Sequence, residues 1–449
     1  MLRISARWVL PVSAPPIADG ALLVDGHGRI VDVGANAHVP QPESARSLVL
    51  GDAALLPGLV DVHAHPELAA FRGLIEDLSF PDWISALQRV KGAAADRETY
   101  ELSAHWTCVE ASAAGVTTLA ATEESAAALG ALNDAGLRGV VYAEVFGPSP
   151  AQVAGSMADL RTRMEKLRRQ ETDLVRLGVS PHAPFTVCDD LFSQVAAYAL
   201  QEGLPVAVHA AESADEQALV TRAEGVFAQR LRARGIDVVA RGRSTIDLLE
   251  RTGVLETRPL LIHCVRVDRA DIARIAAAGA TVAHCPAANA RLGHGIAPLM
   301  ELLDAGIAVG LGGDSVASNN RIDILEEAHL AQMLQRAQRG AAALLPASQL
   351  LRLATLDGAR ALGLETRTGS LEPGKDADLC AVSLAAPHVL PIHDPAVAVV
   401  HAARASDVIL TVVRGRILHG GGTDARMRAD QLRARLDAVA DRLRQERAP

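Results

Sequence analysis

Two histidines separated by one residue, His63 and His65, follow the apolar segment Leu56–Val62. This segment begins with a Pro-Gly turn and is predicted to be a short buried strand. Side chains at positions i and i+2 of a strand point to the same face, so both imidazoles can hold one metal ion. Histidine pairs near loops also occur without metal, and only the rest of the chain decides between these interpretations.

Further histidines and an aspartate end later segments that we also predict to be strands. They are His182 on the fourth strand, His209 on the fifth, His263 on the sixth, His284 on the seventh and Asp314 on the eighth. Strand ends are a small part of the chain, yet they hold six of its 15 histidines. Chance does not explain this gathering, so we predict a metal site.

We assign His63, His65, His209 and Asp314 as the metal ligands. Three imidazoles and one carboxylate suit one divalent ion, zinc first, with iron or manganese as alternatives. One coordination position then stays open for water, and a bound ion lowers the pKa of such a water to about 7.

Two other residues are predicted to move protons together with Asp314. His263 is placed to orient or deprotonate the water, and Glu212, three residues after His209, to protonate a ring or leaving nitrogen. The alternative for Glu212 is a carboxylate at a helix start, where the helix dipole favours it.

The chain has three lysines, Lys91, Lys166 and Lys375, and none ends a predicted strand, so no carboxylated lysine can bridge two ions. We therefore predict a single metal.

The elements that carry these residues alternate between apolar strands and helical stretches such as Glu98–Ala114, Pro150–Arg169 and Asp268–Ala278. This alternation predicts an α/β fold, a (β/α)8 TIM barrel over residues 55–365, with the site at the carboxyl ends of the strands. The predicted strands are Leu55–His65, Val116–Thr122, Gly139–Glu144, Val175–His182, Pro205–Glu212, Pro259–Cys264, Ala280–Pro286 and Ala308–Ser315.

The two ends of the chain contain residue types that are typical of strands and turns. Residues 1–54 and 366–420 are predicted to form one composite β-sandwich domain beside the barrel. Residues 349–362 are predicted to be a further helix, and residues 421–449 a C-terminal surface helix.

The composition limits the partners and the compartment. The net charge is −9 and no basic cluster lies on a predicted face, which argues against nucleic acid. The apolar runs are too short to span a membrane. Five cysteines without a Cys-x-x-Cys pair indicate a reducing cytoplasm. We expect a small-molecule substrate and a homo-oligomer, a dimer.

Several motifs are spread over nearly the whole chain: Pro57–His65, Phe71–Asp77, Trp83-Ile84, His209–Glu212, His284–Gly293 and Gly310–Ser315. Together they resemble the amidohydrolase superfamily. Within it they are similar to the mononuclear metal-dependent deaminases of adenosylhomocysteine/methylthioadenosine and of aminodeoxyfutalosine, and to triazine hydrolases.

This resemblance implies a mononuclear zinc, sometimes iron, deaminase in which His182 contacts a nucleoside sugar. It also suggests Trp83, Arg72 and Glu144 as substrate-binding residues, although Trp83 can equally anchor its loop. The chain departs from the pattern after Trp83. Adenosylhomocysteine deaminases carry a sugar-binding glutamate there, whereas Gln88–Gly92 contains no acid.

The segment between Glu212 and His263 is long, which is more similar to the aminodeoxyfutalosine deaminases. Its arginines could pair with a substrate carboxylate or lie on the solvated surface. They are Arg230, Arg232, Arg234 and Arg241.

We therefore expect a metal-dependent hydrolytic deaminase, an aminohydrolase of an aminated heterocycle such as an adenine-type nucleoside. One alternative is hydrolysis of another C–N or C–Cl bond on a similar ring, of the triazine or cyclic amide type. The other is an inactive barrel that only binds a partner. The residues leave open whether His284 contacts substrate.

Overall fold

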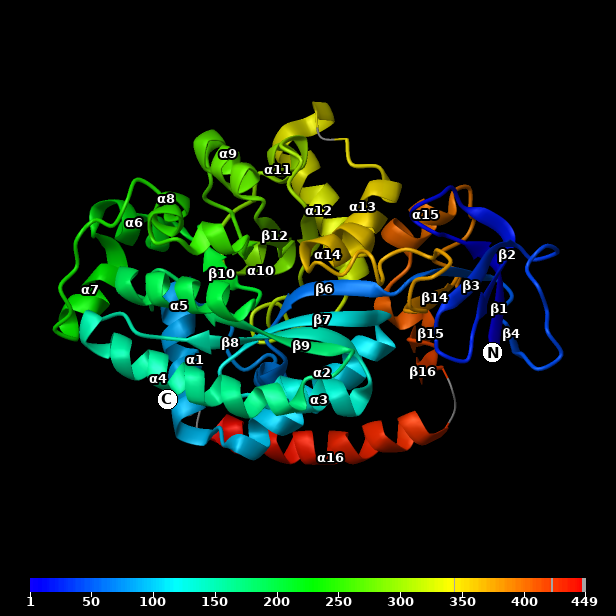
Figure 1. Cartoon of the computed structure of the whole chain (residues 1–449), viewed down its shortest axis with the longest axis horizontal. Helices are drawn as coiled ribbons and strands as arrows, with labels where there is room; N and C mark the ends of the chain where they lie inside the picture. Colours follow the sequence, from blue (N-terminus) through cyan, green and yellow to red (C-terminus); the bar gives the residue numbers. More distant parts are fainter. Residues whose placement is uncertain (343, 421–422, 446–449) are drawn as a thin grey trace.

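Eight parallel strands lie at the centre of the computed structural model, which describes residues 1–342, 344–420 and 423–445 (Figure 1). They form two four-stranded sheets, β6 to β9 and β10 to β13. The strands are β6 (Leu59–Ala64), β7 (Val116–Glu123), β8 (Arg138–Val145), β9 (Val175–Pro181), β10 (Ala207–Ala210), β11 (Leu260–His263), β12 (Thr281–His284) and β13 (Val309–Leu311).

Backbone pairing at both seams joins these two sheets into one barrel. Val179 pairs in parallel with Val206 at one seam, and Ala64 pairs in parallel with Asp314 at the other. The amide of Asp314 donates to the carbonyl of His63 across a distance of 2.8 Å. The predicted barrel of eight strands is confirmed, and each of the eight predicted strand segments overlaps one of its strands.

The strands are buried along nearly their whole length because helices cover the outer face of the barrel. Capping boxes at Asp96 and Asp268 begin two of these helices, α2 and α9. The covering helices are α2 (Arg97–Ala113), α3 (Ala127–Ala135), α4 (Val153–Leu167), α5 (Asp189–Glu202), α9 (Arg269–Ala278), α10 (Pro286–Arg291), α11 (Leu299–Asp304), α12 (Ile324–Arg339), α13 (Ala347–Ala354) and α14 (Leu356–Ala361).

Both chain ends contribute to a second sheet, seen at the right of Figure 1. Hydrogen bonds join its strands into one sheet in the order β16-β15-β14-β5-β1-β2-β3, with β4 also paired to β1. The sequence predicts a sandwich for these same segments. The strands are β1 (Leu2–Val9), β2 (Ile17–Val24), β3 (Ile30–Ala35), β4 (Arg46–Val49), β5 (Ala53–Pro57), β14 (Leu379–Ser383), β15 (Val408–Val413) and β16 (Arg416–His419).

Two predicted elements are each divided in the structure. The strand expected over residues 55–65 consists of β5, which pairs within the second sheet, and β6, which pairs within the barrel. Gly58 separates them, and a Cβ atom there would overlap the Thr117 side chain. The helix expected over residues 349–362 is broken at Thr355, whose φ and ψ of −136° and −88° are not helical.

Helices that follow the barrel strands build a cover over their carboxyl ends. They are η1 (Pro66–Phe71), α1 (Phe80–Ala94), α6 (Ala214–Arg222) and α7 (Gly225–Ala233). Helix α8 (Thr245–Arg251) instead packs beside α9 on the outside of the barrel. Short turns complete the chain: η2 (Pro150–Gln152), η3 (Arg168–Gln170), η4 (Val254–Thr257), η5 (Gly340–Ala342), α15 (Pro395–Val397), η6 (Ala398–Ala402) and η7 (Ala405–Asp407).

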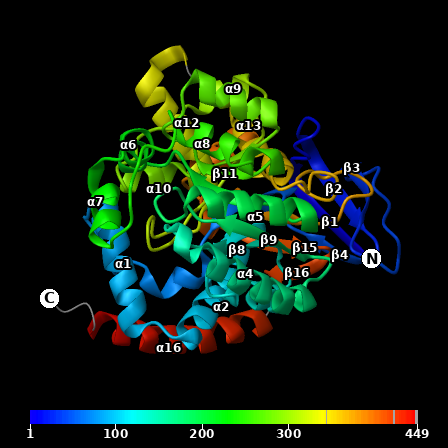
Figure 2. The same ribbon diagram turned by 60° about the vertical axis from the view of Figure 1, so that its left-hand side comes forward.

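The last helix, α16 (Thr423–Gln445), runs along α1 and α2 in both views (Figures 1 and 2). Its Val439 and Leu443 are buried in one apolar cluster with Phe80 and Trp83 of α1. The predicted ends of this helix, at residues 421, 422 and 446–449, lie outside the described residues. Within the described ranges, no helix has the length and apolar character needed to cross a membrane.

Candidate active site

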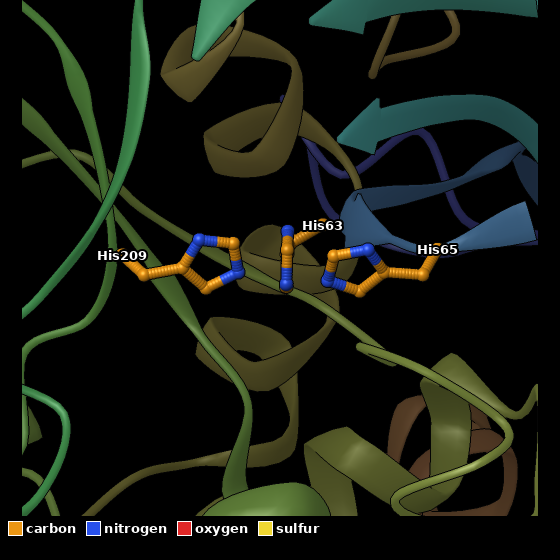
Figure 3. Close-up of side chains that lie close together, drawn as sticks. All are labelled: His63, His65 and His209. Atoms are coloured by element: carbon orange, nitrogen blue, oxygen red, sulfur yellow. The ribbon is translucent and has the colours of Figure 1, made fainter. Parts of the chain in front are cut away.

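The four predicted metal ligands lie together where the first, fifth and eighth barrel strands end. His63 and His65 are at the end of β6, His209 is on β10, and Asp314 follows β13. The three rings converge (Figure 3), and one nitrogen of each lies within 4.8 Å of the others. Asp314 Oδ1 lies 3.2 Å from His63 Nε2 and 3.6 Å from His65 Nε2.

The chemistry of these groups fits a divalent metal ion. His63 Nε2 is buried and has no hydrogen-bond partner among the described residues, so it is available as a ligand atom. Burial and the neighbouring histidines lower the pKa of His209 to about 3 and hold the pKa of His65 well below its usual range. Burial alone would raise the pKa of Asp314, but the rings of His63 and His263 hold it well below its usual range. Neutral imidazoles and an ionised carboxylate are the forms that bind metal.

Neighbouring polar groups orient these side chains, as is common around metal sites. Thr122 Oγ1 lies 3.4 Å from His63 Nδ1, and the carbonyl of His182 lies 3.1 Å from His209 Nδ1. The hydroxyl of Ser318 donates to Asp314 Oδ2 across 3.1 Å. The ring nitrogen or carboxylate oxygen that faces the centre of the site is therefore fixed for each of these ligands.

Asp61 is a buried residue of this site that the sequence analysis does not identify. Its Oδ1 accepts hydrogen bonds from the amides of His63 and Gly313, at 3.2 and 3.0 Å. It thereby joins the segments that carry the ligands of β6 and β13. Burial raises the pKa of Asp61 to about 7. Its position two residues before His63, on the same face of the strand, is the sequence signal for it.

The two predicted proton-transfer residues are adjacent. Glu212 Oε1 lies 3.5 Å from His263 Nε2, and His263 Nδ1 lies 2.9 Å from Asn289 Oδ1. Because an amide oxygen only accepts, Nδ1 of His263 carries the hydrogen and its Nε2 is free to take up a proton. His263 and Asp314 have φ angles of 74° and 58°, a left-handed backbone that is strained for such residues and common at functional sites.

A second imidazole contacts Glu212, and the sequence analysis does not identify it. His294 Nε2 lies 3.0 Å from Glu212 Oε1, and the ring is 2% exposed. Burial would raise the pKa of Glu212, but His263 and His294 lower it to about 2. His294 lies between two glycines in the loop after β12 rather than at a strand end, so a search of strand ends misses it.

A cavity of about 570 Å³ opens onto these groups, a size typical of small-molecule sites. Three of the residues suggested for substrate binding, Trp83, Glu144 and His182, line its wall. The fourth, Arg72, is not among the lining residues, and its guanidinium instead pairs with Glu110 at 2.5 Å. Arg72 thereby ties the end of η1 to α2, and its role in substrate binding stays a prediction.

The arginines of the long insertion have different surroundings. Arg230 pairs with Asp82 at 2.9 Å, Arg241 pairs with Asp189 at 2.5 Å, and Arg232 donates to the carbonyl of Ala223. Arg234 lines the cavity. His284 is buried and is not a lining residue, so the geometry favours a structural role for it.

Comparisons with known proteins show the family of this chain. The model of the Amidohydrolase family matches residues 54–418. A relative from Moorella thermoacetica, named 5-methylthioadenosine/S-adenosylhomocysteine deaminase, is 32% identical over 95% of this chain and 96% of its own length. This chain belongs to the amidohydrolase family.

Solved structures are similar to this amidohydrolase along nearly its whole length. An adenosine deaminase from Xanthomonas campestris with bound zinc is 29% identical, with a TM-score of 0.85 over 97% of this chain and 98% of its own. The atrazine chlorohydrolase from Arthrobacter aurescens in complex with zinc is 23% identical, with a TM-score of 0.84 over 98% of this chain and its own entire length, and shows the shared fold.

Proposed function

We propose that this amidohydrolase is a zinc-dependent hydrolytic deaminase of an aminated heterocycle, an adenine-type nucleoside. The observation that carries the proposal is the placement of Glu212 and His263 beside the cluster of His63, His65, His209 and Asp314 at the floor of one cavity. A zinc ion on these four ligands would supply Lewis-acid polarisation and would lower the pKa of water.

The residues of the chain then account for the proton transfers. His263 Nε2 accepts a proton from the attacking water and orients it toward the amine-bearing carbon. The Glu212 carboxylate takes this proton from His263 Nε2, 3.5 Å away, and delivers it to the neighbouring ring nitrogen. Asp314 and His263 then move the remaining proton of the added hydroxyl to the amine, the C–N bond breaks, and ammonia leaves. Water and the amine are consumed, and the oxo product and ammonia are formed.

The cavity wall supports the choice of a purine-sized substrate. The aromatic side chains of Trp83, Phe80 and Phe185 line the cavity and offer flat apolar surfaces for a heterocycle. Relatives named for adenine nucleosides support the same substrate class.

An ammonia-release assay on the zinc-loaded protein tests the proposal. The panel contains adenosine, methylthioadenosine, adenosylhomocysteine and aminodeoxyfutalosine, with a chlorotriazine and a cyclic amide beside them. We expect ammonia from at least one nucleoside. Turnover of only the chlorotriazine or the cyclic amide, with no ammonia from any nucleoside, contradicts the proposal.

The cellular setting and the assembly are proposals as well. All five cysteines are buried and are thiols rather than disulfides, which supports a cytoplasmic enzyme. The dimer and the division of the chain at residues 54, 366 and 421 stay predictions, which gel filtration and limited proteolysis test.

A further inference from the structure

Glu216, a buried glutamate in the segment that follows Glu212, takes no part in the proposed proton transfers. It lies in the first turn of α6 and is 0% exposed. It is not among the residues that line the cavity, so it acts on a bound molecule only through other residues. A buried carboxylate is costly unless hydrogen bonds satisfy its oxygens, so the donors around Glu216 show which part of the chain it holds.

Three donors meet this carboxylate, and two of them are backbone amides of the active site. The amide of Ala211 donates to Oε1 across 2.8 Å, and the amide of Glu212 donates to Oε2 across 3.2 Å. The hydroxyl of Thr245, at the start of α8, also donates to Oε1. Each oxygen of Glu216 therefore holds one amide of the segment that carries the catalytic carboxylate.

This segment has a backbone conformation that needs support. Ala211 has a φ of 52°, in the left-handed region, which is strained for a residue with a Cβ atom. It is the only residue between the end of β10 and Glu212, so its bend sets the direction in which Glu212 leaves the strand. Its carbonyl accepts a hydrogen bond from the amide of Arg266, at 2.7 Å, in the segment after β11. The bend is thus held on both sides, by Glu216 and by the chain that follows His263.

We propose that Glu216 is a positioning residue, which fixes the backbone of Ala211 and Glu212 and so keeps the Glu212 carboxylate aimed at His263 and at the substrate. The inference rests on the proposed deaminase function and deepens it, because it adds a residue on which proton delivery by Glu212 depends. The position requires a carboxylate. A glutamine has one acceptor oxygen, and its NH2 group would face a backbone N–H with no acceptor between them.

The substitution Glu216→Gln in the zinc-loaded protein tests this proposal with two measurements. Hydrogen–deuterium exchange on overlapping peptides over residues 207–214 reports the two amides directly. We expect their exchange to become roughly tenfold faster or more, because one amide loses its acceptor. Steady-state ammonia release is expected to show a kcat about 10- to 10²-fold lower, because small displacements of a reacting group are costly. KM and zinc content should stay near the wild-type values, since Glu216 contacts neither the cavity nor a ligand side chain.

Glu123→Gln is the matched control for the loss of a buried carboxylate. Glu123 ends β7, is 1% exposed, and accepts hydrogen bonds from the amides of Ala127 and Ala128 at 2.9 and 3.0 Å. Its strand carries none of the proposed ligands or proton-transfer residues. This variant should lose stability as Glu216→Gln does, yet keep the wild-type kcat and the slow exchange over residues 207–214.

Glu216→Asp is the second variant, and it keeps the charge and both acceptor oxygens but is one methylene shorter. Its kcat and its amide exchange are expected to lie between those of the wild-type protein and Glu216→Gln. If Glu216→Gln does not fold, the same two measurements on Glu216→Asp decide the question.

The outcomes separate this positioning role from the deaminase proposal. Unchanged exchange at the amides of Ala211 and Glu212 overturns the role of Glu216, whether or not the protein releases ammonia. Faster exchange together with a wild-type kcat overturns it as well. If the wild-type protein releases no ammonia, the proposed deamination is contradicted, whereas faster exchange confined to residues 207–214 still supports the hold of Glu216 on this segment.

Discussion

Glu212 has two imidazole nitrogens beside one carboxylate oxygen, from His263 at 3.5 Å and from His294 at 3.0 Å. They offset the effect of burial and lower the pKa of Glu212 to about 2, so the ionised carboxylate prevails at neutral pH. Glu212 therefore begins the proposed cycle as a proton acceptor and gives up its proton only afterwards. His294 acts through Glu212 and is a positioning residue.

Replacement of His294 by glutamine is predicted to lower kcat about tenfold or more, with little change in KM or metal content. The loss of the imidazole raises the pKa of Glu212, so the ionised form is lost at a higher pH. The acidic limb of the kcat/KM profile is therefore expected to move to higher pH. A pH series of steady-state rates measures this shift.

His329→Asn is the control for this prediction, because His329 is a half-buried histidine whose Nδ1 lies 3.0 Å from His401 Nδ1, outside the cavity wall. It should leave the pH profile unchanged. An unshifted acidic limb in His294→Gln would show that His294 does not act on Glu212.

Substitutions of His263 and of Asp314 are predicted to have different effects on metal binding. His263→Asn should keep the metal and lose about 10²- to 10⁴-fold in kcat, because it removes a proton acceptor. Asp314→Ala should lose both metal and activity, because it removes a ligand. Elemental analysis of the purified variants beside their turnover numbers checks both. Wild-type turnover in His263→Asn refutes the assignment of this residue as the base.

At the scale of elements, the strands could be predicted from the sequence and the loops could not. Strands such as β7 and β11 are buried on both faces, so they appear in the sequence as apolar runs. Strand ends in such a barrel border the site, and His63, His209 and His263 are found there. Lys91 and His294 lie on a helix and in a loop. Whether such side chains face the cavity depends on tertiary packing, which residue spacing does not encode.

Helix α16 supports the cavity wall from behind, and Leu443 is its fully buried contact. Leu443→Ala is predicted to lower the free energy of unfolding by about 2 to 5 kcal/mol. It should also raise KM more than it lowers kcat, because α1, which carries Trp83 and Lys91, loses its support. Denaturant unfolding and steady-state kinetics measure the two effects.

Arg444→Ala, on the exposed face of the same helix, is the matched control and should change neither quantity. If Leu443→Ala left KM unchanged despite the loss of stability, α16 would have no influence on the cavity.

Across the whole molecule, a buried ion cluster fixes the barrel to the segment that leads into the second sheet. Arg138, at the start of β8, is 1% exposed and pairs with Asp378 at 2.6 Å and with Asp376 at 2.8 Å. Arg138→Met would leave two buried carboxylates without this partner. It is predicted to destabilise the protein by about 3 to 5 kcal/mol, as measured by denaturant unfolding.

Arg367→Met is the comparison, because the side chain of Arg367 also pairs with Asp376 but is 38% exposed. Its loss should cost only about 0 to 1 kcal/mol. Equal effects of the two substitutions would mean that burial does not set the strength of this cluster.

The central claim is that one metal ion at His63, His65, His209 and Asp314 makes the chain a deaminase. Titration of the metal-free protein with zinc, while ammonia release from a nucleoside substrate is recorded, tests it most directly. We predict no ammonia release without metal and an increase in activity that stops at one equivalent of zinc per chain. Full activity without metal, or a rise that ends only at two equivalents, contradicts it.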